Sequence, residues 1–136
     1  MLTELAHIMK TCLNCSSEIS INRKYCSAIC QRDFEYKQFV LSWRNGSNTR
    51  GKYFISHYIR RYLFEKSNNS CYICGWNTTN PYTGKIPLEV HHKDGDCTNC
   101  NEDNLELLCP NCHSLTSTFK NYNKGNGRDK RKTEVV

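Results

Sequence analysis

Two adjacent histidines close an apolar stretch in the segment LEVHHKDGD, residues 88–96. Neighbouring side chains of a regular strand point to opposite faces, so His91 and His92 cannot easily share one role within such a strand. Either one ring is buried and the other exposed, or the strand ends here and both rings serve one site. Imidazoles accept protons and bind metal ions near neutral pH, which makes this segment the first candidate for chemistry.

A third histidine, His113, follows on a different element. The pattern of apolar and turn residues predicts a strand over 86–92, a turn at 94–96, a second strand over 105–108 and a helix over 110–119. A helix packed across this hairpin would bring His113 to the strand end that carries His91 and His92. One imidazole could then act as a base toward water while the others hold a cation, as phosphodiester cleavage requires.

The chain contains ten cysteines, which fall into pairs separated by two or three residues. This spacing suits tetrahedral zinc, because a tight turn aims two thiolates at one point. We group the four early cysteines into one structural site and two later pairs into another. The first predicted site is Cys12, Cys15, Cys26 and Cys30, and the second is Cys71, Cys74, Cys109 and Cys112.

The remaining pair, Cys97 and Cys100, lies in the polar loop DGDCTNCNEDN. We favour free or loosely paired thiols here. The pair could instead replace another pair in the second zinc site or bind a third metal ion incompletely.

Size and composition limit the class of protein. With 136 residues and 38% hydrophobic residues, the chain allows one domain or two very small ones, and such domains usually need added crosslinks or metal ions. The start MLTELAHIMK has no apolar signal-peptide core, and no stretch approaches the ~20 apolar residues of a membrane span. We therefore expect a reduced, cytoplasmic protein, without a membrane partner, whose cysteines bind metal.

Positive charge favours a polyanionic partner. The net charge is +6, and the tail over 120–132 is rich in lysine and arginine, with Asp129 as its single acid. A predicted helix over 52–66 adds a basic face, which could also be merely solvated. The candidate DNA-binding residues are Arg60, Arg61, Lys124 and Arg128.

The modules follow one another along the chain. We predict an N-terminal four-cysteine zinc finger over 1–30, a helical basic linker region over 31–70, and a second module with a basic tail over 71–136. A helix is also expected within the linker region over 31–43, and the break at 45–48 separates it from the helix over 52–66.

The motifs LEVHHKDGD and EDNLELLCPNCHSLT, with Cys71 and Cys74 in front of them, resemble the HNH endonucleases and their ββα-metal (His-Me finger) fold. More loosely, the segments 43–46, 59–63 and 123–128 and the YCSAIC finger are similar to small HNH proteins encoded by bacteriophages. The resemblance implies a small, zinc-stabilised α+β protein. A treble-clef-like ββα-metal nuclease module would follow a four-cysteine zinc finger and helices, in the host cell of a phage if phage-encoded.

The resemblance also implies roles by position. His92 matches the general base, and His91 and His113 match ligands of a catalytic divalent cation such as Mg²⁺. Asn104 matches the middle asparagine, which holds the loop and orients His92. The second cysteine group matches the family's structural zinc site, so the cofactors are two structural Zn²⁺ ions and one catalytic cation. Ser117 stands where some members carry a further histidine.

Other interpretations remain open for individual residues. His113 could complete a zinc site made of three cysteines and one histidine, His91 could pack within the hairpin, and Asn104 could be a turn residue. We expect a metal-dependent DNA endonuclease that leaves 5′-phosphate and 3′-hydroxyl ends. The alternatives are a non-catalytic zinc-finger DNA-binding protein and, least favoured, a secreted disulfide protein.

Overall fold

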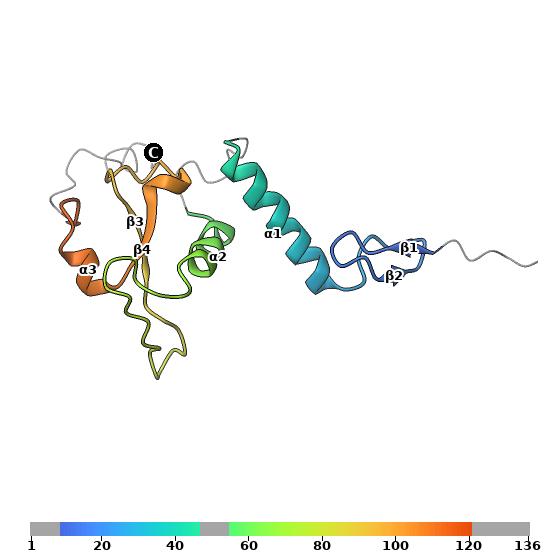
Figure 1. Ribbon diagram of the computed structural model, residues 1–136, viewed down its shortest axis with the longest axis horizontal. Helices are drawn as coiled ribbons and strands as arrows, with labels where there is room; N and C mark the ends of the chain where they lie inside the picture. Colours follow the sequence, from blue (N-terminus) through green and yellow to red (C-terminus); the bar gives the residue numbers. More distant parts are fainter. Residues whose placement is uncertain (1–8, 47–54, 121–136) are drawn as a thin grey trace, which may run out of the picture. The chain divides into compact units, whose positions relative to one another are not determined.

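The computed structural model describes residues 9–46 and 55–120, which belong to two compact units (Figure 1). The first unit is Met1–Ser42 and the second is Trp43–Val136. In the described part of the chain, no helix combines the length and apolar character that crossing a membrane requires. The predicted DNA contacts Lys124 and Arg128 lie outside the described residues.

The first unit joins a small hairpin to a long helix. Strands β1 (Lys10–Thr11) and β2 (Glu18–Ile19) pair antiparallel, with Lys10 opposite Ile19. Helix α1 (Ala28–Arg44) follows, so the helix predicted over 31–43 is present and begins three residues earlier. The rings of Tyr25 and Phe34 lie 5.6 Å apart and connect the chain before the helix to the helix itself.

The second unit contains helix α2 (His57–Lys66), which buries Ile59 and Leu63 as its sequence pattern predicts. The prediction placed the start of this helix at residue 52. Among the described residues it begins at His57, because Ser56 is extended and its hydroxyl accepts the Ile59 N–H at 3.2 Å, an N-cap arrangement. Residues 52–54 lie outside the description.

A hairpin and a short helix complete the second unit. Strands β3 (Glu89–His92) and β4 (Leu105–Leu108) pair antiparallel, with His92 opposite Leu105, and the 3-10 turn η1 (Glu102–Asn104) leads into β4. Helix α3 (Pro110–Ser114) follows β4, so the predicted order of strand, loop, strand and helix is confirmed.

The first strand of the hairpin and the helix after it are both shorter than predicted. β3 begins at Glu89 rather than at residue 86, and α3 ends at Ser114 rather than at residue 119. The N–H groups of Leu115 and Thr116 bond to carbonyls three residues back, which tightens and closes the helix. Leu115 is then 80% exposed, so it contributes nothing to an apolar helix face.

Leucines from the hairpin form the core of the second unit. Helix α2 packs against β4, and α3 packs against both strands. The buried apolar side chains include Leu88, Leu105, Leu107 and Leu108, with Ile59 and Leu63 from α2.

Charged and polar bonds hold the segment that leads into β4. The Glu102 carboxylate accepts from Lys66 Nζ and Tyr62 OH at 2.6 Å each, and from Arg44 Nε at 2.7 Å. Close by, Trp43 Nε1 donates to the Cys100 carbonyl at 2.8 Å. The loop between β3 and β4 is therefore held at its far end by side chains from outside the hairpin.

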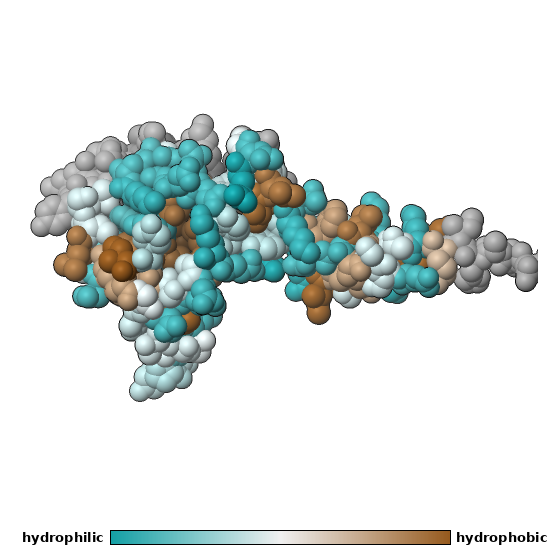
Figure 2. Space-filling view, viewed as in Figure 1, coloured by the Kyte–Doolittle hydropathy of each residue, from teal (hydrophilic) through white to brown (hydrophobic). Residues whose placement is uncertain are grey.

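The segment between Cys74 and β3 projects from the hairpin as a long turn (Figure 1). Asn80 organises it, since its side-chain oxygen accepts the N–H groups of Tyr82 and Thr83 at 2.9 and 3.1 Å. Figure 2 colours its surface white to teal, which means neutral to hydrophilic residues. The whole is a small α+β protein with two groups of four cysteines.

Candidate active site

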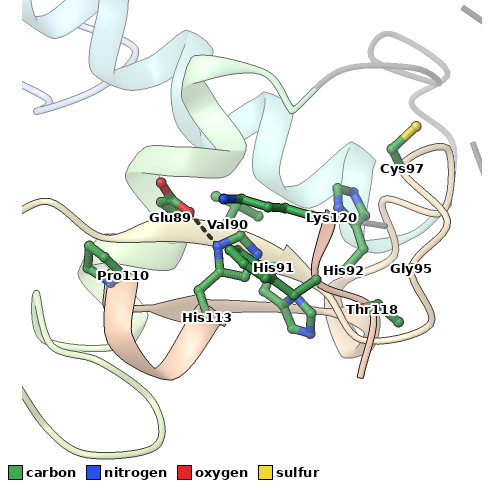
Figure 3. A pocket seen from close by; sticks show the side chains of 11 residues that line it. Glu89, Val90, His91, His92, Gly95, Cys97, Pro110, His113, Thr118 and Lys120 are labelled. Carbon is green, nitrogen blue, oxygen red and sulfur yellow. Dashed lines mark hydrogen bonds and ion pairs between the residues drawn. The ribbon is translucent and has the colours of Figure 1, made fainter. Parts of the chain in front are cut away.

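The three predicted histidines line one pocket of about 440 Å³ where β3 ends and α3 begins (Figure 3). His91 and His92 come from β3, and His113 comes from α3. His91 is 7% exposed and His92 is partly exposed, yet both reach the pocket because it lies at the strand end. Both predicted alternatives therefore apply: the rings differ in burial and still share one site.

The rings of His91 and His113 lie edge to face. Their centroids are 5.3 Å apart at an interplanar angle of 65°. Phe119 contacts the His113 ring at 5.5 Å and 77°. The packing fixes the orientation of His113, so its ring nitrogens point in defined directions.

Glu89 gives His113 a further constraint, because its carboxylate forms a short hydrogen bond with His113 Nδ1. This bond leaves Nε2 of His113 for a ligand, and such carboxylate–histidine pairs orient metal ligands in general. Glu89 was not among the site residues predicted from the sequence. Its place two residues before His91, on the same strand face, was the signal that could have found it.

Burial acts on both histidines of β3. It lowers the pKa of His91, and His113, His92 and Lys93 lower it further through charge repulsion. Burial also lowers the pKa of His92, against the opposing influence of Asp94 and Asp96. Both imidazoles are therefore neutral near pH 7, the state in which an imidazole binds a metal ion or accepts a proton.

Asn104 holds the loop that follows His92. Its amide nitrogen donates to Asp94 Oδ1 at 2.9 Å and to the Asn99 carbonyl at 2.8 Å, while its oxygen accepts the Asp94 N–H at 3.1 Å. The backbone adds a bond from Lys93 N–H to the Asn104 carbonyl at 2.9 Å. Asn104 is thus bonded on both sides of the turn that begins at the end of β3.

The turn itself depends on Asp94 and Gly95. Asp94 accepts the N–H of Asp96 and the side-chain amide of Asn99, at 2.9 and 2.7 Å. Gly95 has φ of 77°, a left-handed conformation that side chains other than glycine adopt with strain. Asp94 therefore organises the turn, the role that its sequence position predicted.

The first cysteine cluster consists of Cys12, Cys15, Cys26 and Cys30, whose sulfur atoms all lie within 4.8 Å of one another. Backbone hydrogen bonds, foremost that of Cys15, lower the pKa of the Cys12 thiol to about 6. Hydrogen bonds with the Cys30 and Cys15 sulfurs raise the pKa of Cys26 to about 11. One thiolate is thus ready to bind a metal ion, which would displace protons from the others.

The second cysteine cluster consists of Cys71, Cys74, Cys109 and Cys112, again within 4.8 Å of one another. Burial raises the pKa of the Cys71 thiol, but backbone hydrogen bonds from Cys74, Cys109 and Ile73 outweigh it and lower the pKa to about 6. The cluster is complete with four sulfurs, and His113 is not part of it. The four sulfurs therefore provide a full tetrahedral set of zinc ligands without His113.

Cys97 and Cys100 belong to neither cluster among the described residues. They lie in the loop after His92, and Cys100 Sγ is 3.9 Å from His92 Nε2. Cys97 also lines the histidine pocket. The pair is therefore close to the candidate site without completing a four-ligand group.

Two further polar side chains, Lys120 and Thr118, line the histidine pocket. Neither residue was singled out from the sequence, because both follow the family motif. Of the predicted DNA contacts, Arg60 is exposed on α2, and Arg61 forms an ion pair with Glu65 at 2.8 Å. Neither arginine lines the histidine pocket.

Fold and site together define a small α+β protein with two groups of four cysteines that could each hold a metal ion. Residues 81–114, which span β3, β4 and α3, match the model of the HNH endonuclease family. A curated relative, the H-N-H endonuclease F-TflIV of Escherichia phage T5, is 36% identical over 107 residues. The segment over residues 81–114 belongs to the HNH endonuclease family.

The extent of these matches differs. The alignment with the phage T5 protein covers 79% of this chain but only 42% of that relative, so the chain spans less than half of its length. No solved structure matches the chain.

Proposed function

We propose that this protein is a metal-dependent HNH DNA endonuclease built on a ββα-metal module. The observation that carries the proposal is the convergence of His91, His92 and His113 on one pocket, from two elements that belong to the family's matched segment. A protein that only binds DNA has no need of three imidazoles around one pocket.

The side chains fit a divalent cation held by His91 and His113. His91 is buried with a lowered pKa, so its ring is neutral and can donate a lone pair. Glu89 occupies Nδ1 of His113 and leaves Nε2 for the cation. Two imidazoles leave most positions of a Mg²⁺ shell for water and phosphate oxygens, as this ion prefers. When bound, the cation supplies positive charge against the scissile phosphate and the leaving oxygen.

His92 serves as the general base in this proposal. Its neutral ring takes a proton from a water molecule, whose oxygen attacks the phosphorus. The bond from phosphorus to the 3′ oxygen breaks, and that oxygen gains a proton from solvent, which gives a 5′-phosphate and a 3′-hydroxyl. Asn104 acts as a positioning residue, because it bonds to the turn that begins directly after His92.

Lys120 contributes a positive charge to the same pocket. Some family members carry a further histidine where this chain has Ser117, so the cation here has fewer protein ligands. The Lys120 ammonium, which lies in the pocket lining, can contact a non-bridging phosphate oxygen and supply part of the missing charge. Thr118 is the second polar group after α3 that can bond to the phosphate.

The two cysteine clusters bind structural Zn²⁺ in this proposal. Four sulfurs close a tetrahedral site and leave no open position for substrate, in contrast to the imidazole pair. The second cluster joins the start of the hairpin module to α3. The zinc ion therefore fixes the helix that carries His113 relative to β3.

DNA is the proposed substrate and partner, with Arg60 of α2 and the basic residues Lys124 and Arg128 as backbone contacts. The predicted division into three modules remains part of the proposal.

The experiment that tests the function is incubation of supercoiled plasmid with the zinc-loaded protein and Mg²⁺ or Mn²⁺. Cleavage by the parent chain that the His92→Ala variant lacks is expected. Binding without cleavage under any divalent ion would favour the non-catalytic DNA-binding alternative.

A further inference from the structure

A second concave site lies in the first unit, which contains none of the residues discussed above as catalytic. A groove of about 400 Å³ is lined by Lys10, Thr11, Leu13, Arg23, Lys24 and Tyr25. We name it the finger groove. Three of its six lining residues are cationic, and none is acidic. Glu18, which faces Thr11 across the hairpin, is not part of the lining.

The three cations of the finger groove differ from most cations described above in having no acidic partner. Lys37, Arg44, Arg61 and Lys66 all form ion pairs with carboxylates. Within the described residues, no ion pair or side-chain hydrogen bond engages Lys10, Arg23 or Lys24, and all three are exposed. Three uncompensated charges around one hollow repel each other, so a multivalent anion that binds there relieves this repulsion.

The two walls of the groove lead directly into the first cysteine cluster. Lys10 and Thr11 precede Cys12, and Arg23, Lys24 and Tyr25 precede Cys26. The Leu13 N–H donates to the Lys24 carbonyl at 3.1 Å and joins the walls. The Tyr25 ring also contacts the ring of Phe34 of α1. A metal ion in the cluster therefore sets the spacing between the cations.

From this arrangement we propose that the finger groove binds the phosphodiester backbone of the DNA substrate, through Lys10, Arg23 and Lys24. The inference rests on the proposed function for the choice of DNA as ligand. Lysine and arginine contacts to phosphate carry no sequence information, so the groove supplies affinity rather than a choice of target. It anchors the finger on the duplex as a second contact, which raises the effective concentration of DNA at the histidine pocket.

The first test uses lysine acetylation followed by mass spectrometry, on the full zinc-loaded chain carrying His92→Ala. A short mixed-sequence DNA duplex is the probe. Lys10 and Lys24 should lose most of their reactivity when DNA is present, whereas Lys37, which is paired with Asp33, should change little. Equal acetylation of Lys10 and Lys24 with and without DNA would overturn the proposal. The readout is independent of cleavage, so it stands even if the chain cuts nothing.

The second test measures DNA affinity against salt concentration. The triple variant Lys10→Gln, Arg23→Gln and Lys24→Gln should bind more weakly, and its slope of log K against log salt should fall by roughly 0.9 for each phosphate that the variant no longer neutralises. Arg32→Gln, which removes an exposed cation of α1 outside the groove, is the matched control and should leave the slope unchanged. An unchanged slope in the triple variant with its zinc retained would refute the groove. If the triple variant loses zinc, the acetylation result decides.

Discussion

His113 faces the ring of His91 at 5.3 Å and simultaneously holds the carboxylate of Glu89 on its Nδ1 atom. Glu89 and His91 are alternate residues of β3, so one strand face provides both the ring beside His113 and the group that orients it. A single strand–helix contact thus orients the two imidazoles that the proposed function assigns to one cation.

Replacing His92 should abolish the chemistry and spare binding. We expect His92→Ala to reduce the rate of plasmid cleavage by roughly 10²-fold or more, the usual contribution of a general base. DNA affinity, measured by fluorescence anisotropy, should remain near that of the parent chain. His57→Ala is the matched control, since His57 is an exposed histidine of α2 that does not line the histidine pocket. A His92→Ala protein that cuts at the parent rate would remove His92 from the mechanism.

Replacing Glu89 should weaken the cation site. We expect Glu89→Gln to raise the Mn²⁺ concentration for half-maximal cleavage by about 10- to 100-fold, because removing the partner of a metal-ligating histidine has effects of this size. The rate at saturating Mn²⁺ should recover in part. Glu106→Gln alters a carboxylate on the opposite strand of the same hairpin, outside the pocket lining, and should leave the Mn²⁺ requirement unchanged. Identical Mn²⁺ curves for Glu89→Gln and the parent would argue against this role.

Replacing Asn104 should loosen the turn after His92. Asn104→Ala removes three side-chain hydrogen bonds, and we expect a loss of about 2 kcal/mol in local stability together with a slower cleavage rate. Faster hydrogen exchange at the Asp94 amide, measured by NMR, reports the loosened turn directly. Asn101→Ala is the control, because the Asn101 side chain caps no backbone group of η1. Unaltered exchange at Asp94 in the Asn104 variant would contradict the prediction.

Metal analysis should find two zinc ions per chain. Cys74→Ser should lower the content to one, because it removes a ligand of the second cysteine cluster. The double variant Cys97→Ser and Cys100→Ser should retain two, since neither residue belongs to a cluster within the described part of the chain. A third zinc ion that disappears in the double variant would instead make the loop pair a metal site.

The Glu102 network should stabilise the second unit in a pH-dependent way. Burial raises the pKa of Glu102, but hydrogen bonds from Lys66, Tyr62 and Arg44 outweigh it and hold the pKa at about 2. A carboxyl group whose folded pKa lies below its unfolded value of about 4.3 adds stability above that value. This stability is lost as pH falls from about 4.3 toward 2.

Glu102→Gln tests that network. Chemical denaturation at pH 7 should show a decrease of about 2 kcal/mol in the free energy of unfolding, limited by the exposure of Arg44 and Lys66 to screening salt. The difference between parent and variant should be the same at pH 7 and pH 5, and should shrink only below about pH 4.3. A difference that already shrinks between pH 7 and pH 5 would assign the effect to another group.

Local sequence patterns predicted the hairpin and helix well because their determinants are local. The alternating apolar residues around Leu105 and the proline after Cys109 specify a strand and a helix start without help from distant residues. The predicted helix boundaries were wrong where a single hydrogen bond determines the end of the helix. The Ser56 hydroxyl determines the start of α2, and the tightened turn at Leu115 determines the end of α3. These helix ends depend on individual hydrogen bonds, which the helix propensities of the residues do not predict.

The residues around the histidine pocket were harder to predict from the sequence. Glu89 looks like an ordinary exposed strand residue until its partner on α3 is known, and Lys120 follows the family motif. The finger groove arises because two segments separated along the chain meet at Leu13 and Lys24. Contacts of this kind depend on how the chain folds back on itself, which spacing alone cannot specify.

The second cysteine cluster has a consequence for the timing of synthesis. Cys71 and Cys74 precede the hairpin, but Cys109 and Cys112 follow it, so a nascent chain on the ribosome cannot close the cluster until almost all described residues have emerged. His113 appears only at that same late stage. An interrupted translation product that stops before residue 109 therefore lacks two of the four sulfurs of this cluster and the third imidazole of the histidine pocket.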